Sequence, residues 1–98
     1  MKYVVQGIER YHYKLSLVKS PPYVVYYEGN FDVLDKPLLA IVGPRLKSDY
    51  ADQVLSNLFA ILQRYDIVTI SGLADGVDWL VHNLSIQYGI PTIAVIGE

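Results

Sequence analysis

The sequence predicts an α/β fold: a three-layer, Rossmann-like parallel sheet, present here as an incomplete domain. Three aliphatic runs carry this prediction, at residues 38–43, 66–71 and 91–96, and the first two end in glycine turns. A strand buried in a parallel sheet is a continuous apolar run, whereas the segments between these runs show helical spacing of apolar residues. Strands that alternate with helices favour parallel pairing through right-handed crossovers. The pattern amounts to half of a doubly wound domain.

Two helices are expected between the three strands. The first covers residues 48–64 and starts at Ser48, a favourable N-cap residue. The second covers residues 76–88, and Gly89 follows it where a left-handed C-cap belongs. Apolar residues three or four positions apart should form the buried faces of the two helices: Val54, Leu55, Leu58, Phe59 and Leu62 in the first, and Val77, Leu80, Val81, Leu84 and Tyr88 in the second.

The N-terminal part is punctuated by the segment Ser20-Pro21-Pro22, which ends any preceding helix. Residues 11–19 are compatible with a short helix. Residues 23–27 are rich in β-branched and aromatic side chains and are expected to add a strand to the α/β unit. We interpret residues 1–22 as an N-terminal extension and residues 23–98 as one partial Rossmann-like domain.

Composition and charge exclude several classes of protein. With 98 residues and 52% hydrophobic content, the chain suits one small folded domain and is too apolar for a disordered one. No apolar run reaches the ~18 residues that span a bilayer, and the first residues lack a secretory pattern. We therefore expect a cytoplasmic protein without a membrane partner. The absence of cysteine excludes disulfides and thiolate metal sites.

The net charge of −2 gives no general attraction for nucleic acid, so any polyanion site must be local. The two glycine turns supply such a site. Glycine at the carboxyl end of a parallel strand allows a tight turn into a helix whose free N–H groups face an anion. Arg45 and Lys47 lie beside the first turn and can bind phosphate. The predicted phosphate-binding residues are Gly43, Arg45, Lys47, Ser48, Ser71, Gly72 and Gly76.

The same residues also allow a structural interpretation. The glycines can serve tight turns and close helix–sheet packing alone, and the two basic side chains can be solvated loop charges. Asp78 and His82 lie four residues apart on one helical face, which favours a structural Asp–His contact over acid–base chemistry. The histidines lack neighbouring ligands, and no nucleophile elbow or P-loop is present, so we expect no metal, no cofactor and no catalytic residues.

Several motifs together resemble a known family. They are Pro21 to Asn30, Ala40-Ile41-Val42-Gly43-Pro44-Arg45, Ser48 with Tyr50, and Ser71 to Asp78 with His82. In this order they resemble the DNA-processing protein A family, also called DprA or Smf. The resemblance implies an extended Rossmann fold that binds single-stranded DNA and helps to load the recombinase RecA in natural transformation and DNA recombination. It places Gly43, Arg45 and Ser48 in the family's first turn, and Ser71, Gly72, Gly76 and Asp78 in its second.

The sequence departs from that family at three positions of these motifs. Pro44 stands where serine or threonine is common and removes one backbone N–H from the first turn. Ala51 replaces a usual glycine. Asp75 stands where arginine is common, which exchanges a phosphate attractor for a repeller.

Two other functions remain open from the sequence. One is a nucleotide-ligand site like that of the related phosphoribohydrolases, which would need a Gly-Gly-Gly turn and a catalytic glutamate; neither is visible. The other is a truncated domain that binds nothing and only folds or dimerises. The apolar run at residues 91–96 predicts an unpaired hydrophobic sheet edge, so we also expect a homo-oligomer, with Trp79, Ile86 and Tyr88 as candidate contacts.

Overall fold

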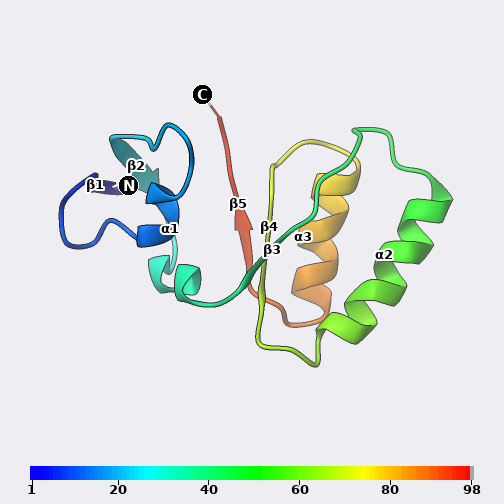
Figure 1. Ribbon diagram of the computed structural model, residues 1–98. Helices are drawn as coiled ribbons and strands as arrows, with labels where there is room; N and C mark the ends of the chain where they lie inside the picture. Colours follow the sequence, from blue (N-terminus) through cyan, green and yellow to red (C-terminus); the bar gives the residue numbers. More distant parts are fainter. Residues whose placement is uncertain (98) are drawn as a thin grey trace. The chain divides into compact units, whose positions relative to one another are not determined.

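The computed structural model describes residues 1–97, which form two compact units that divide between Asp35 and Lys36 (Figure 1). The first unit contains two strands, one α-helical turn and a 3-10 helix. The second contains three strands and two longer helices. Each unit has its own sheet.

In the first unit, β1 (Lys2–Val5) pairs antiparallel with β2 (Val24–Tyr27). Helix α1 (Tyr13–Ser16) is a single turn, and the 3-10 helix η1 spans Phe31–Asp35. The strand expected at residues 23–27 is therefore present, but it pairs with β1 and not with the parallel strands. A strand's own composition indicates that it is extended and carries no information about its partner.

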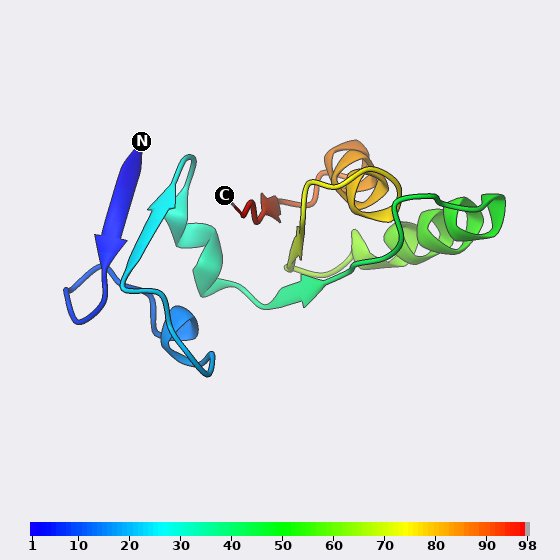
Figure 2. The ribbon, with the colours of Figure 1, turned by 90° about the horizontal axis from the view of Figure 1, so that it is seen from above.

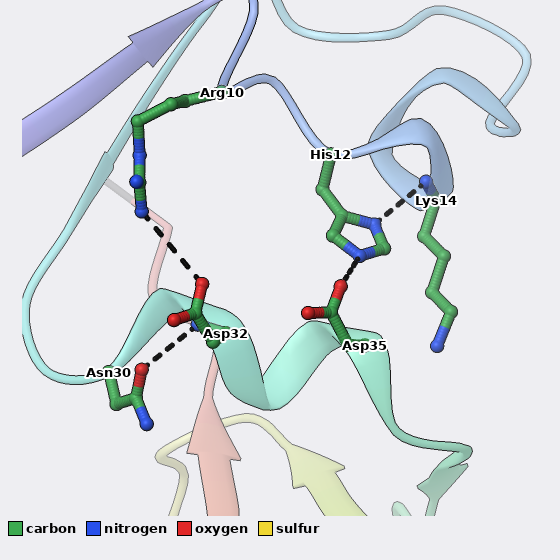
Figure 3. Close-up of polar contacts among 6 residues, drawn as sticks. All are labelled: Arg10, His12, Lys14, Asn30, Asp32 and Asp35. Atoms are coloured by element: carbon green, nitrogen blue, oxygen red, sulfur yellow. Dashed lines mark hydrogen bonds and ion pairs between the residues drawn. The ribbon is translucent and has the colours of Figure 1, made fainter.

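Polar contacts tie the two helical segments of this unit together (Figure 3). The backbone N–H of Lys14 donates to Nδ1 of His12, so the ring proton lies on Nε2, which donates to Asp35 at 2.8 Å. The side chain of Asn30 accepts from the backbone N–H of Asp32. These contacts bring residues 30–35 into the first unit, which therefore ends later than residue 22. The expected division into an extension, residues 1–22, and a domain, residues 23–98, stays a prediction.

The second unit follows the predicted order of elements. It contains β3 (Leu38–Ala40), α2 (Asp49–Leu62), β4 (Val68–Ser71), α3 (Val77–Gln87) and β5 (Thr92–Ala94). The strands are parallel and lie in the order β3-β4-β5. This arrangement confirms the predicted Rossmann-like α/β class. Both helices lie on the same side of the sheet (Figure 2), so this unit supplies the sheet and one helical layer of the predicted three.

The core lies between this sheet and the two helices. Phe59 of α2 and Val81 of α3 are completely buried, and the rest of the cluster surrounds them: Leu55, Val77, Leu84 and Ile90. The predicted helical faces are confirmed except at Val54, which is 43% exposed. Val54 lies at the margin of the apolar stripe of α2.

Gly76 and Gly89 provide a test of how tightly the loops pack. Both have positive φ, at +84° and +71°. A Cβ at Gly76 would collide with the backbone of Arg45 and Pro44, whereas a Cβ at Gly89 would meet no atom within 4 Å. We expect Gly89→Ala to lower the free energy of unfolding by about 1–2 kcal/mol through backbone strain alone. Gly76→Ala should cost at least about 1 kcal/mol more because of overpacking. Urea denaturation measures both, and equal losses would contradict the packing described.

Candidate nucleic-acid interface

The two predicted glycine turns lie at the same edge of the sheet, because parallel strands end on the same side. The loop after β3 also packs directly on the loop after β4. The backbone N–H of Val77 donates to the carbonyl of Pro44 at 3.1 Å. A Cβ at Gly43 would lie 2.7 Å from Cβ of Val77, so Gly43 is required by this close approach. The predicted juxtaposition of the two turns is therefore confirmed.

The loop after β3 is open to solvent throughout residues 42–50. Among residues 1–97, the Arg45 side chain has no hydrogen-bond or ion-pair partner. Lys47 binds Asp52 through Nζ at 2.8 Å, and both side chains are partly exposed. Arg45 is thus the unengaged cation of this loop, while the charge of Lys47 is partly offset.

Ser48 begins helix α2. Its hydroxyl oxygen accepts from the backbone N–H of Ala51 at 3.2 Å, which is the N-cap contact that the sequence predicts. Asp49 and Asp52 lie in the first turn, where the helix dipole favours negative charge. Tyr50 is 78% exposed in the same turn. This end of α2 therefore combines a capped helix start, a free guanidinium group and an exposed aromatic ring.

The loop after β4 uses its polar groups inside the protein. The hydroxyl of Ser71 donates to the carbonyl of Ile41 at 2.6 Å, which joins β4 to the segment after β3. The carbonyl of Gly72 accepts from His82 at 2.7 Å. A Cβ at Gly72 would lie 2.7 Å from Oδ2 of Asp78. The structure thus brings Ser71, Gly72 and Gly76 beside the first loop and gives each of them contacts within the protein.

A buried chain of hydrogen bonds holds His82 in one tautomer. The carbonyl of Gly72 can only accept, so Nε2 of His82 carries the proton. Nδ1 then accepts from the hydroxyl of Thr92 at 2.8 Å, and Thr92 accepts from Thr69 at 2.8 Å. The hydroxyl of Thr69 is also within 2.7 Å of Ser85. Both ring nitrogens are engaged, so His82 makes no hydrogen bond to Asp78, the residue with which a structural contact was expected.

Sequence reasoning missed the chain of hydroxyl groups that begins at His82: Thr92 is its direct partner, Thr69 bonds Thr92, and Ser85 lies beside Thr69. The signal was the presence of hydroxyl residues in two otherwise aliphatic strands, together with one three residues after the histidine. Such residues are expected to find partners when buried. Within residues 1–97, no cluster of three or more His, Cys, Asp or Glu side chains could hold a metal ion. No helix in that part of the chain is both long and apolar enough for a membrane crossing.

A parallel sheet whose glycine loops and helix starts meet at one edge defines the Rossmann-like class of ligand-binding folds. Comparison with known proteins identifies the particular family. The family model of the DNA recombination-mediator protein A matches residues 2–98, and the chain belongs to this family.

The relatives are bacterial DNA-processing proteins. The chain is 37% identical over 87 residues to the DNA processing protein DprA of Streptococcus pneumoniae, covering 89% of this chain and 30% of that protein. It is 35% identical over 90 residues to DprA of Bacillus subtilis, covering 91% and 30%. The crystal structure of the pneumococcal DprA superposes with a TM-score of 0.89 at 33% identity, covering 97% of this chain and 33% of that one. The chain thus spans about a third of the length of these relatives.

The hydrogen-bond chain beneath Gly72 can be tested at Thr92. Thr92→Val keeps the shape of the side chain but leaves Nδ1 of His82 without its donor. We expect a loss of about 1–3 kcal/mol in the free energy of unfolding, the cost of an unsatisfied buried polar group. Thr92→Ser retains the hydroxyl and should preserve the Nε2–H tautomer in ¹⁵N NMR spectra. A Thr92→Val protein of unchanged stability would show that the hydroxyl is dispensable.

Proposed function

We propose that this chain binds single-stranded DNA through the phosphate backbone, as part of a DNA-processing protein acting in recombination and natural transformation. The observation that carries the proposal is the unengaged, exposed Arg45, placed at the start of α2 in a chain of the DNA recombination-mediator protein A family. An arginine that has no partner within the protein is available for bidentate contact with a phosphate. We further propose a binding module and not an enzyme, located in the cytoplasm.

The loop after β3 is the proposed phosphate contact. In this proposal Arg45 provides the charge-assisted hydrogen bonds, and Lys47 contributes the part of its charge that Asp52 does not offset. Gly43 allows the close approach of this loop to α3, and Ser48 caps α2. The exposed ring of Tyr50 offers a surface on which a base can stack. A cation combined with an aromatic ring is the typical arrangement for binding single strands.

The loop after β4 has a supporting role in the proposal. The hydroxyl of Ser71 and the carbonyl of Gly72 are engaged with Ile41 and His82. Gly76 lies against the backbone of Arg45. These contacts favour the interpretation that Ser71, Gly72 and Gly76 hold the Arg45 loop in place, and leave only backbone N–H groups of this turn for direct contact with phosphate.

Binding is expected to be weak, salt-sensitive and dependent on Arg45. A site that neutralises two phosphates should give a log–log salt slope of about −1.4 for single strands, at ~0.7 per phosphate. Arg45→Ala should weaken binding by about 1–3 kcal/mol, because a charge-assisted hydrogen bond is lost. Asp75→Arg should strengthen it, because an exposed repelling charge at the same edge becomes attractive. Fluorescence anisotropy of a labelled oligothymidine measures these changes.

Arg64→Ala is the matched control for these variants. Arg64 is exposed and follows the far end of α2, so its removal changes the net charge equally without touching the proposed site. If Arg45→Ala and Arg64→Ala weaken binding to the same extent, the effect is one of overall charge and the phosphate contact is elsewhere.

We also propose self-association and, as the resemblance implies, contact with RecA. The support for self-association is apolar exposure: Trp79 is 53% exposed and Ile86 is 73% exposed, both on α3. Sedimentation at high micromolar concentration should detect a dimer that Ile86→Lys weakens. A monomer at every concentration would disprove this part of the proposal. Tyr88 is partly buried against the core, which makes it the weakest of the three candidate contacts.

A further inference from the structure

The N-terminus of α3 differs from that of α2. Gly76 supplies no side-chain cap to α3, which is 11 residues long. The N–H of Val77 is bonded to Pro44, whereas the backbone N–H groups of Asp78 and Trp79 have no acceptor among residues 1–97. Two open donors at the positive end of a helix are the groups that hold phosphate in Rossmann-like folds.

The carboxylate of Asp78 lies at this helix start. Asp78 is only 8% exposed, and its Oδ1 is buried without a hydrogen-bond partner among the described residues. Its Oδ2 lies against Gly72, 2.7 Å from the position a Cβ would take there. In a phosphate-binding turn the missing glycine side chain lets the ligand approach the backbone. Here the protein's own carboxylate fills that space.

Among residues 1–97, no basic side chain forms an ion pair with this carboxylate. The ion pairs within residues 1–97 involve other groups, and His82, one turn further along α3, directs its ring nitrogens to Gly72 and Thr92. Asp75, in the same loop, has the same sign of charge but is exposed, so its field is screened by salt. Asp78 is buried at the helix start itself, where its carboxylate occupies the space beside Gly72.

We propose that Asp78 is a specificity-determining residue that excludes phosphate from the N-terminus of α3. The phosphate contacts at this edge are thereby confined to the Arg45 loop. This inference rests on the proposed binding of single-stranded DNA and names the residue that limits how many phosphates the edge engages. Replacing Asp78 by serine removes the carboxylate from that space while the open N–H groups of residues 78 and 79 remain, so a further phosphate can bind.

The test compares salt slopes for oligothymidine between about 50 and 200 mM salt. Asp78→Ser should steepen the log–log slope by about 0.7, one additional phosphate on a single strand, and tighten binding at the low-salt end. Arg45→Ala combined with Asp78→Ser should retain that additional contribution. Asp66→Asn is the control, because it removes one negative charge from an exposed residue before β4, at the opposite edge of the sheet.

The slope separates the possible results. Tighter binding with an unchanged slope would mean that Asp78 affects the DNA only through the overall electric field of the protein. Weaker binding would mean that the Asp78 carboxylate accepts a hydrogen bond from the nucleic acid. Either result overturns the inference. Asp78→Ala replaces Asp78→Ser, with the same expected slope, if circular dichroism shows that the serine variant is unfolded. If the unmodified chain does not bind, the proposed function fails, and binding gained by Asp78→Ser still supports the inference while its absence refutes it.

Discussion

The packing of the loop after β3 on the start of α3 is the contact on which the candidate interface depends. Its components are the hydrogen bond from Val77 to Pro44 and the seating of Gly76 against the backbone of Arg45. Both are backbone contacts, so they hold a loop whose side chains are otherwise exposed from residue 42 to residue 50. An exposed loop without such support would lose more conformational entropy on binding a ligand. The support places Arg45 at the sheet edge while leaving its guanidinium group free.

A buried polar chain lies beneath this contact. A chain of hydrogen bonds through Thr69, Thr92 and His82 connects the sheet to the carbonyl of Gly72. The loop after β4 is therefore held by these side chains as well as by its contacts with the loop after β3. Thr69 and Ser85 are wholly buried, and the core tolerates them because their hydroxyls are paired. Hydrogen bonds of this kind are directional, and they define the position of the turn more narrowly than apolar packing does.

Charges of both signs lie close together at this edge, which a net charge of −2 does not reveal. Arg45 is unengaged, Lys47 is bound to Asp52, and Asp49 and Asp75 are exposed nearby. Such an arrangement suits a site with few phosphate contacts, for which the salt slope is correspondingly shallow.

The sequence alone determined the order of elements in the second unit, the parallel sheet, the N-cap at Ser48 and the meeting of the two glycine turns at one edge. These features follow from local properties: the period of apolar residues, capping chemistry, and the rule that parallel strands end on the same side. Most of the core was predictable for the same reason, with Val54 as the exception.

Tertiary structure decided the features that need a distant partner. The strand Val24–Tyr27 pairs with β1, and the boundary between the compact units falls at Asp35, because pairing and side-chain contacts join residues far apart in the chain. His82 contacts Thr92 and Gly72 in place of Asp78, and the carboxylate of Asp78 fills the space that Gly72 leaves. Helical spacing places two residues on one face, but which atoms they meet depends on the elements that pack against that face.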